Sequence, residues 1–300
     1  MTDSALKEGH SSKGFYDKYY KVLLLIPILM LIISIVYLFS FYSQNGDIMH
    51  KDVTLTGGTS LTIYSENISL TDLEAFLKPK FDDLVIRSLT DINTEKTIAI
   101  SIETASTPEE LTKEVESFLD YSLDETNSST EFTGDALSKS FYKELVRAVL
   151  IAFFFMSIVI FILFRSFLPS FYVILCAFSD IVIPLAIVDY FGLRLSTAGI
   201  AAFLMLIGYS VDTDILLTTR VLKRREEGAL NDRIFGAMKT GFTMIATALI
   251  AVSIAYFLVI SPTLKQVFLI LSIGLFIDAI ITWLMNAGMI KWYCERKGYK

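Results

Sequence analysis

Four aspartates stand in or beside the most apolar stretches of this sequence. Asp212 and Asp214 lie two residues apart in GYSVDTDILLTTR, and Asp180 and Asp278 lie near the middle of two other apolar runs. No lysine or arginine lies at similar depth in these runs. An aspartate at the centre of a bilayer costs about 2.5–3.5 kcal/mol on insertion scales, and without a nearby cation its protonated form is favoured. We therefore predict a proton relay that uses these four carboxylates.

The two-residue spacing constrains this relay. Residues two apart on a helix differ by about 200° around its axis, so Asp212 and Asp214 cannot share one face of a regular helix. Either they face different surroundings, or the helix is irregular after Gly208. The alternative is structural: the carboxylates brace helices by accepting hydrogen bonds from hydroxyls such as those of Ser210 and Thr213, or Asp214 faces a vestibule on the cytoplasmic side.

The elements that must hold these residues are membrane helices. The chain has 300 residues, is 53% hydrophobic and has a mean hydropathy of +0.56, which favours the membrane class over a soluble domain. Six segments are long enough to cross a bilayer, which needs about 20 residues each. They are Val22–Tyr42, Val146–Leu168, Ser170–Phe191, Ser196–Leu217, Gly241–Ile260 and Leu264–Met289.

Basic residues indicate the orientation of the six spans. Lysine and arginine gather in the tail at 1–21, in the loop after the fourth span and in the tail at 291–300. These three segments lie on one side if the chain has six spans, and basic loops face the cytoplasm. We therefore expect a multi-pass protein of the cytoplasmic membrane with both termini inside, a first helix at 22–42 and helices two to six within 141–290.

An acidic segment at 43–140 separates the first two spans and should lie outside. It has 19 acidic against 7 basic residues between Asp47 and Lys139. Its strand and helix signals alternate as βαββαβ, which predicts an α+β ferredoxin-like domain. The expected elements are a strand at Val53–Tyr64 broken by Gly57-Gly58, a helix at Thr71–Leu77 with a Thr71/Glu74 capping box, strands at Asp83–Leu89 and Lys96–Ile102, a helix from Thr107 to about Asp120, and a strand at Thr130–Thr133.

Other functional classes have little support in the residues. Two cysteines (Cys176, Cys294) and two histidines (His10, His50) suggest no disulfide framework, metal site or cofactor. A Ser-His-Asp set, a phosphate loop and a basic patch for nucleic acid are all missing from the pattern, so we expect neither an enzyme nor a nucleic-acid binder. The sequons at Asn67 and Asn127 would face outside, where glycosylation could occur, but chance occurrence explains these two short motifs better.

The stretch IGYSVDTDILLTTR, which includes Gly208, Tyr209 and Arg220, closely resembles the fourth-span signature of the SecF family. That family also has six spans, one extracytoplasmic domain after the first span, and a Gly-Gly motif that corresponds here to Gly57-Gly58. Bacterial relatives read GYS-x-N-D-T and carry the carboxylate at the position of Thr213. The VDTD form here, in which the carboxylates flank this position, looks like the archaeal branch. The resemblance to bacterial relatives therefore implies the location of the site but not which residue carries the proton.

The resemblance implies an auxiliary subunit of the Sec protein-export machinery and membership of the RND superfamily. Implied partners are a SecD-like subunit that shields the aspartates, a SecYE-type channel, an unfolded secretory polypeptide and membrane lipid. Proton flow past the aspartates would move the outer domain through Gly57-Gly58, although the two glycines could equally be a β-bulge. The alternatives are an RND-type half-transporter for small molecules or lipids, and an assembly subunit without ion coupling.

Overall fold

The computed structural model describes residues 16, 18–65, 68–90, 97–224, 226 and 228–299. Several residues used above lie outside these ranges, so their predictions are not addressed by the structure. They are His10, Asn67 of the first sequon and Lys96 at the start of one expected strand, together with four residues of the basic tails and loop, which are Lys7, Lys13, Arg225 and Lys300.

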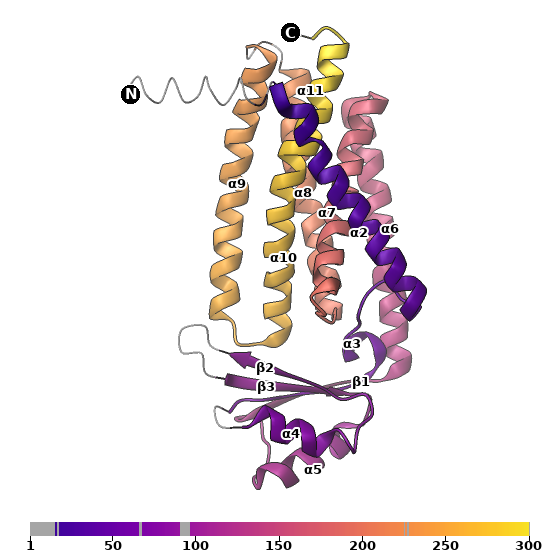
Figure 1. Cartoon of the computed structure of the whole chain (residues 1–300), viewed down its shortest axis with the longest axis vertical. Helices are drawn as coiled ribbons and strands as arrows, with labels where there is room; N and C mark the ends of the chain where they lie inside the picture. Colours follow the sequence, from indigo (N-terminus) through magenta and orange to yellow (C-terminus); the bar gives the residue numbers. More distant parts are fainter. Residues whose placement is uncertain are drawn as a thin grey trace, which may run out of the picture.

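Six helices in the described part are long and apolar enough to cross a membrane, as predicted. They are built from α2 (Leu25–Asn45), α6 (Asp135–Phe164), α7 (Phe167–Tyr190), α8 (Thr197–Lys223), α9 (Leu230–Leu258), and α10 (Pro262–Ile280), which continues through the π-helix η2 (Ile281–Asn286) into α11 (Ala287–Arg296). The helices run side by side, and α11 lies at the end of the bundle remote from the sheet (Figure 1).

Three of these helices form the centre of the bundle. Of the most apolar window in each span, 56% of residues are buried in α7 and in α8 and 50% in the α10 span, against 6% in α6 and 11% in α9. The four aspartates of the predicted relay are on these three central helices. The peripheral helices leave large apolar side chains exposed, as helices in contact with lipid or another subunit do.

The remaining elements form a small sheet domain, which we define as residues 53–133. It contains α3 (Val53–Thr56), β1 (Gly58–Ile63), α4 (Leu70–Leu77), β2 (Val85–Thr90), β3 (Thr97–Thr104), α5 (Pro108–Leu119) and β4 (Ser128–Thr133). The strands pair antiparallel in the order β2-β3-β1-β4. The sheet lies between the bundle and the pair α4 and α5 (Figure 1).

Strand alternation gives the sheet two different faces. Leu61, Ile63, Ile100 and Ile102 point to one face, where they form an apolar core with residues of α4 and α5 such as Leu73. The side chains of the other face are mostly hydroxyls and charges. This second face looks towards the bundle.

Two local predictions for this domain were wrong. Val53–Thr56 is a helical turn, because the Asp52 carboxylate caps it by accepting from Thr54 N at 3.3 Å. The N-cap of α4 is Ser69, whose hydroxyl accepts from Asp72 N at 3.4 Å, and not Thr71 of the expected capping box.

Gly57 and Gly58 join α3 to β1 with φ angles of +97° and +131°, which favour glycine. A Cβ atom on Gly58 would overlap the Thr104 carbonyl oxygen and lie 2.9 Å from Ala105 Cα. We expect Gly58→Ala to destabilise the sheet domain by about 1–3 kcal/mol or more, measured as faster limited proteolysis of the purified chain. Gly134→Ala is the control, because a Cβ there meets nothing within 4 Å; equal resistance of both variants would contradict this account.

Candidate functional site

The candidate site is a cluster of three carboxylates at the centre of the bundle. Asp180 on α7, Asp214 on α8 and Asp278 on α10 are each 0% exposed. Each central helix contributes one carboxylate, so the cluster exists only when all three helices pack together. The sequence identified all three residues, and the structure brings their helices into one core.

Hydroxyl groups of α8 link the carboxylates. Ser210 Oγ donates to Asp180 Oδ2 at 2.5 Å. Thr213 Oγ1 lies 3.3 Å from both oxygens of Asp278 and donates to the Ser210 carbonyl at 2.8 Å. Ser210 and Thr213 are therefore in direct contact with the carboxylates, where the structural alternative placed them.

Two further polar residues of the cluster were missed from the sequence. Thr282 Oγ1 lies 3.1 Å from Asp214 Oδ1 and 3.0 Å from Asp278 Oδ1, and Asn286 Nδ2 donates to Asp214 Oδ1 at 2.7 Å. Both lie in η2, and π-helical turns inside longer helices are frequent at functional sites. The available signal was a polar stripe at 278, 282 and 286 in an otherwise apolar span.

The hydrogen-bonding capacity of the cluster is incomplete. Asp180 Oδ1, Asp214 Oδ2 and Asn286 Oδ1 are buried and have no hydrogen-bond partner in the part of the chain that the structure describes. Within the described ranges, no lysine, arginine or histidine forms an ion pair with any of the three carboxylates. The single proton of the Thr282 hydroxyl can serve only one of its two carboxylate neighbours at a time. The cluster thus offers more acceptor oxygens than donors.

Asp212 has different surroundings. It is exposed on the outer side of α8, whereas Asp214 is buried, and α8 remains a regular helix through both. It lines an open groove of about 380 Å³ with residues that include Thr219, Arg220 and Arg224. The structure thus does not bring Asp212 into the buried cluster, and it resolves the two-residue spacing in favour of two environments.

Of the other motif residues of α8, Tyr209 and Arg220 form hydrogen bonds with α9, and Gly208 has no close neighbour. Tyr209 donates its hydroxyl to the Met244 carbonyl of α9 at 3.0 Å. Arg220 Nη1 of α8 donates to Thr240 Oγ1 of α9 at 3.4 Å. Gly208 has nothing within 4 Å of the position that a Cβ would take, so this point on α8 is unoccupied.

Comparison with known proteins agrees with this architecture. Residues 113–296 match the model of the C-terminal region of the SecD/SecF protein-export membrane proteins. The SecF protein of Methanocaldococcus jannaschii is 38% identical over 92% of this chain and 96% of its own length. SecF of Methanothermobacter thermautotrophicus is 37% identical over 93% and 94%. The chain belongs to the SecF family of protein-export membrane proteins.

The fold also matches part of SecDF. A crystal structure of SecDF from Thermus thermophilus, described as a translocon-associated membrane protein, superposes with a TM-score of 0.72 at 18% identity, and covers 93% of this chain. SecDF in its super-membrane-facing form gives a TM-score of 0.61 at 20% identity. The chain spans 38–39% of the length of those SecDF chains.

Proposed function

We propose that the chain is an auxiliary subunit of the Sec export machinery, which works with a SecD-like partner late in translocation and is driven by protons that pass Asp180, Asp214 and Asp278. The observation that carries this proposal is the arrangement of three fully buried carboxylates on three different helices, none of which forms an ion pair with a cation of the described residues. The export role in this proposal is based on the family relationship. The use of protons as the driving ion is based on the carboxylate cluster.

The physical argument for protons rests on the cost of buried charge. Removing an ionised carboxylate from water costs several kcal/mol even after relaxation, and hydroxyl donors such as Thr282 offset only part of this for two carboxylates at once. Binding a proton removes the charge and turns an acceptor oxygen into a donor. Loading and release of protons would therefore change the contacts between α7, α8 and α10.

A SecD-like partner would cover the open side of α8. Met205, Gly208 and Asp212 are exposed at spacings of three and four residues, so they form one stripe along the helix. A carboxylate facing lipid is costly, and a glycine without neighbours allows close approach of another helix. We propose that the partner packs on this stripe and provides a counter-charge for Asp212.

Gly208→Leu tests this stripe. We expect the chain to fold normally, because the position is open, while the amount of SecD-like subunit that co-purifies falls about tenfold, since a clash worth 1.4 kcal/mol changes binding tenfold. The measurement is quantitative co-purification from native membranes, with Ile250→Leu on the exposed face of α9 as a control. Undiminished recovery of the partner would place the interface elsewhere.

The basic loops and tails support an orientation in the cytoplasmic membrane with both termini inside and the sheet domain outside. The elements follow one another along the chain as βαββαβ, and the strands lie in the sheet in the order β2-β3-β1-β4. Both features support a ferredoxin-like domain. This domain would hold a polypeptide that emerges from a SecYE-type channel, and α3 with Gly57-Gly58 would connect it to the bundle.

The deciding experiment is export of a secretory protein in vesicles that contain the channel, the SecD-like subunit and this chain, with and without a pH gradient. We expect the gradient to accelerate late translocation only when this chain is present. Equal rates with and without the chain would refute the proposed role. A complex that moves small molecules or lipids in place of polypeptides would favour the half-transporter.

A further inference from the structure

The polar face of the sheet encloses a cavity against the bundle. Its volume is about 270 Å³, and its lining combines strand residues with residues at the α7–α8 turn and at the start of α10. Strand register places Glu103 beside Ser60 and Ser101 beside Thr62 on this face. The face is therefore built from hydroxyls and charges, in contrast to the apolar face under α4 and α5.

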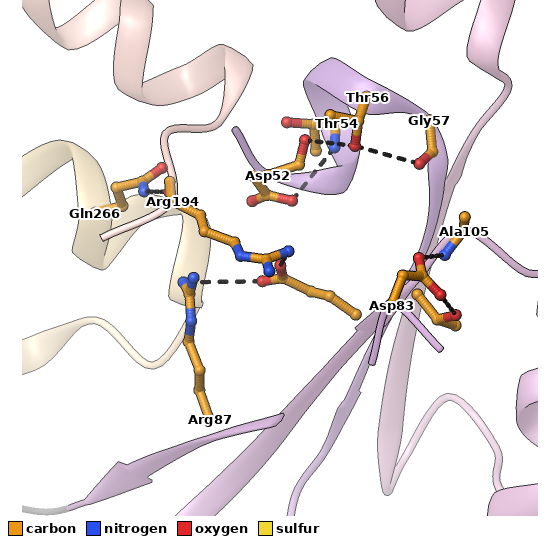
Figure 2. A network of polar contacts seen from close by, with 11 residues as sticks. Asp52, Thr54, Thr56, Gly57, Asp83, Arg87, Ala105, Arg194 and Gln266 are labelled. Atoms are coloured by element: carbon orange, nitrogen blue, oxygen red, sulfur yellow. Dashed lines mark hydrogen bonds and ion pairs between the residues drawn. The ribbon is translucent and has the colours of Figure 1, made fainter. Parts of the chain in front are cut away.

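Glu103 is the most deeply buried charged side chain of this cavity, with 5% exposure. Its Oε1 lies 3.9 Å from Arg87 Nη1 on β2, and its Oε2 lies 3.9 Å from Arg194 Nη1 on the α7–α8 turn. Figure 2 shows both guanidinium groups pointing to one carboxylate. Among the described residues, no donor forms a hydrogen bond with Glu103 Oε2, so this buried oxygen lacks the close donors that would stabilise an ionised carboxylate.

The α7–α8 turn is also connected by backbone bonds to the segment that leads into the sheet domain. Leu195 N donates to the His50 carbonyl at 2.7 Å, and Asp52 N donates to the Leu195 carbonyl at 3.0 Å. Thr197 N, at the start of α8, donates to Thr54 Oγ1 at 3.1 Å. The helix α8, which carries Asp214, thus begins directly after the α7–α8 turn, whose Arg194 forms an ion pair with Glu103.

Charged and titratable groups surround Glu103 from every adjoining element. Burial and the neighbouring Asp52 carboxylate raise the pKa of Glu103 to about 7, while Arg87 and Arg194 act in the opposite direction. Burial likewise raises the pKa of Asp52, against the donors of Thr54 and Val53. The other groups that line the same cavity are Tyr64, Glu131, Tyr256 and Lys265.

We propose that Glu103 is a proton-sensitive latch. The backbone bonds of Leu195 hold the sheet domain against the α7–α8 turn, and a buried, ionised Glu103 without close donors opposes this contact, so protonation favours the closed contact and ionisation loosens it. This inference rests on the proposed function, which places the sheet domain outside the cytoplasm. In that orientation Glu103 would respond to the external proton concentration. In the closed state the carboxyl group is buried beside Asp52. In an open state water would reach it and restore its ordinary pKa of 4.5.

The sign follows from these two values. The closed state binds the proton more tightly, so closure is strongest at pH below 4.5 and weakens as the pH rises towards 7. Across this window each pH unit changes the closing equilibrium by up to about tenfold. Above pH 7 both states are ionised and the dependence ends.

The test is a distance measurement between spin labels on the full-length chain in lipid nanodiscs. Cysteines that replace Glu109 on α5 and Ile260 after α9 carry the labels, and both native cysteines are buried. We expect the short-distance population to fall as the pH is raised from 5 to 8. Glu103→Gln should stay closed throughout, and Arg194→Gln should move the midpoint to higher pH because it removes a cation that favours ionisation.

Glu131→Gln is the matched control, since Glu131 lines the same cavity but is exposed, and it should titrate like the unmodified chain. A distance distribution that does not change with pH in the unmodified chain would overturn the latch, as would an unchanged titration in Glu103→Gln. The measurement needs no channel or secretory protein, so its failure would leave the export role standing.

Discussion

Asp214→Asn is expected to abolish the acceleration of export by a pH gradient, so that the ratio of rates with and without the gradient falls to unity. Asparagine has nearly the same shape and still accepts from Asn286 Nδ2 and Thr282 Oγ1, which contact the native Oδ1. It cannot bind and release a proton, and this is the only property that the proposal requires. The measurement is the vesicle export assay with an imposed gradient.

Asp212→Asn is the control for this prediction, because it removes a carboxylate two residues away on the same helix but outside the buried cluster. In vesicles whose complexes retain the SecD-like partner, it should leave the ratio of rates above unity. Export by Asp214→Asn that still responds to the gradient would rule out Asp214 as a proton carrier.

Gly274→Val is expected to separate the helices that carry the cluster. A Cβ on Gly274 of α10 would overlap the Leu206 side chain of α8, and overpacking of this kind costs about 1–3 kcal/mol. The shift would also displace Asp278 from Thr213, so we expect both a lower Tm of the purified chain and loss of the gradient effect. Thermal unfolding in detergent and the export assay measure the two effects.

Gly208→Ala is the matched control, because it adds the same first carbon to a position with open space and favours the helix by about 1 kcal/mol. A Tm of Gly274→Val equal to that of the unmodified chain would show that α8 and α10 do not need their close contact.

The spans could be predicted because the length and hydropathy of a segment, both of which can be read from the sequence, indicate whether it is able to cross a membrane. The separation of Asp212 from Asp214 followed from helix geometry. The contacts of Thr282 and Asn286 with Asp214 did not follow from it. Both residues lie in a π-helical turn, which a regular repeat of 3.6 residues per turn does not describe. The polar stripe from Asp278 to Asn286 still marked this face.

The joint between sheet and bundle was harder to predict for a different reason. Val53–Thr56 has β-branched residues typical of a strand, but the Asp52 cap and backbone pairing with Leu195 make it a helical turn. The pairing of Glu103 with Arg194 joins residues 91 positions apart. Contacts between distant segments are set by the tertiary fold, and no local pattern encodes them.

The central claim is that the buried carboxylates of the bundle bind protons. Infrared difference spectroscopy of the assembled complex tests it most directly, because a protonated carboxyl group has a carbonyl band that a carboxylate lacks. We predict such a band at neutral pH, reduced by Asp180→Asn, Asp214→Asn or Asp278→Asn and unchanged by Asp212→Asn. Spectra in which all three side chains are ionised at every pH would contradict the account.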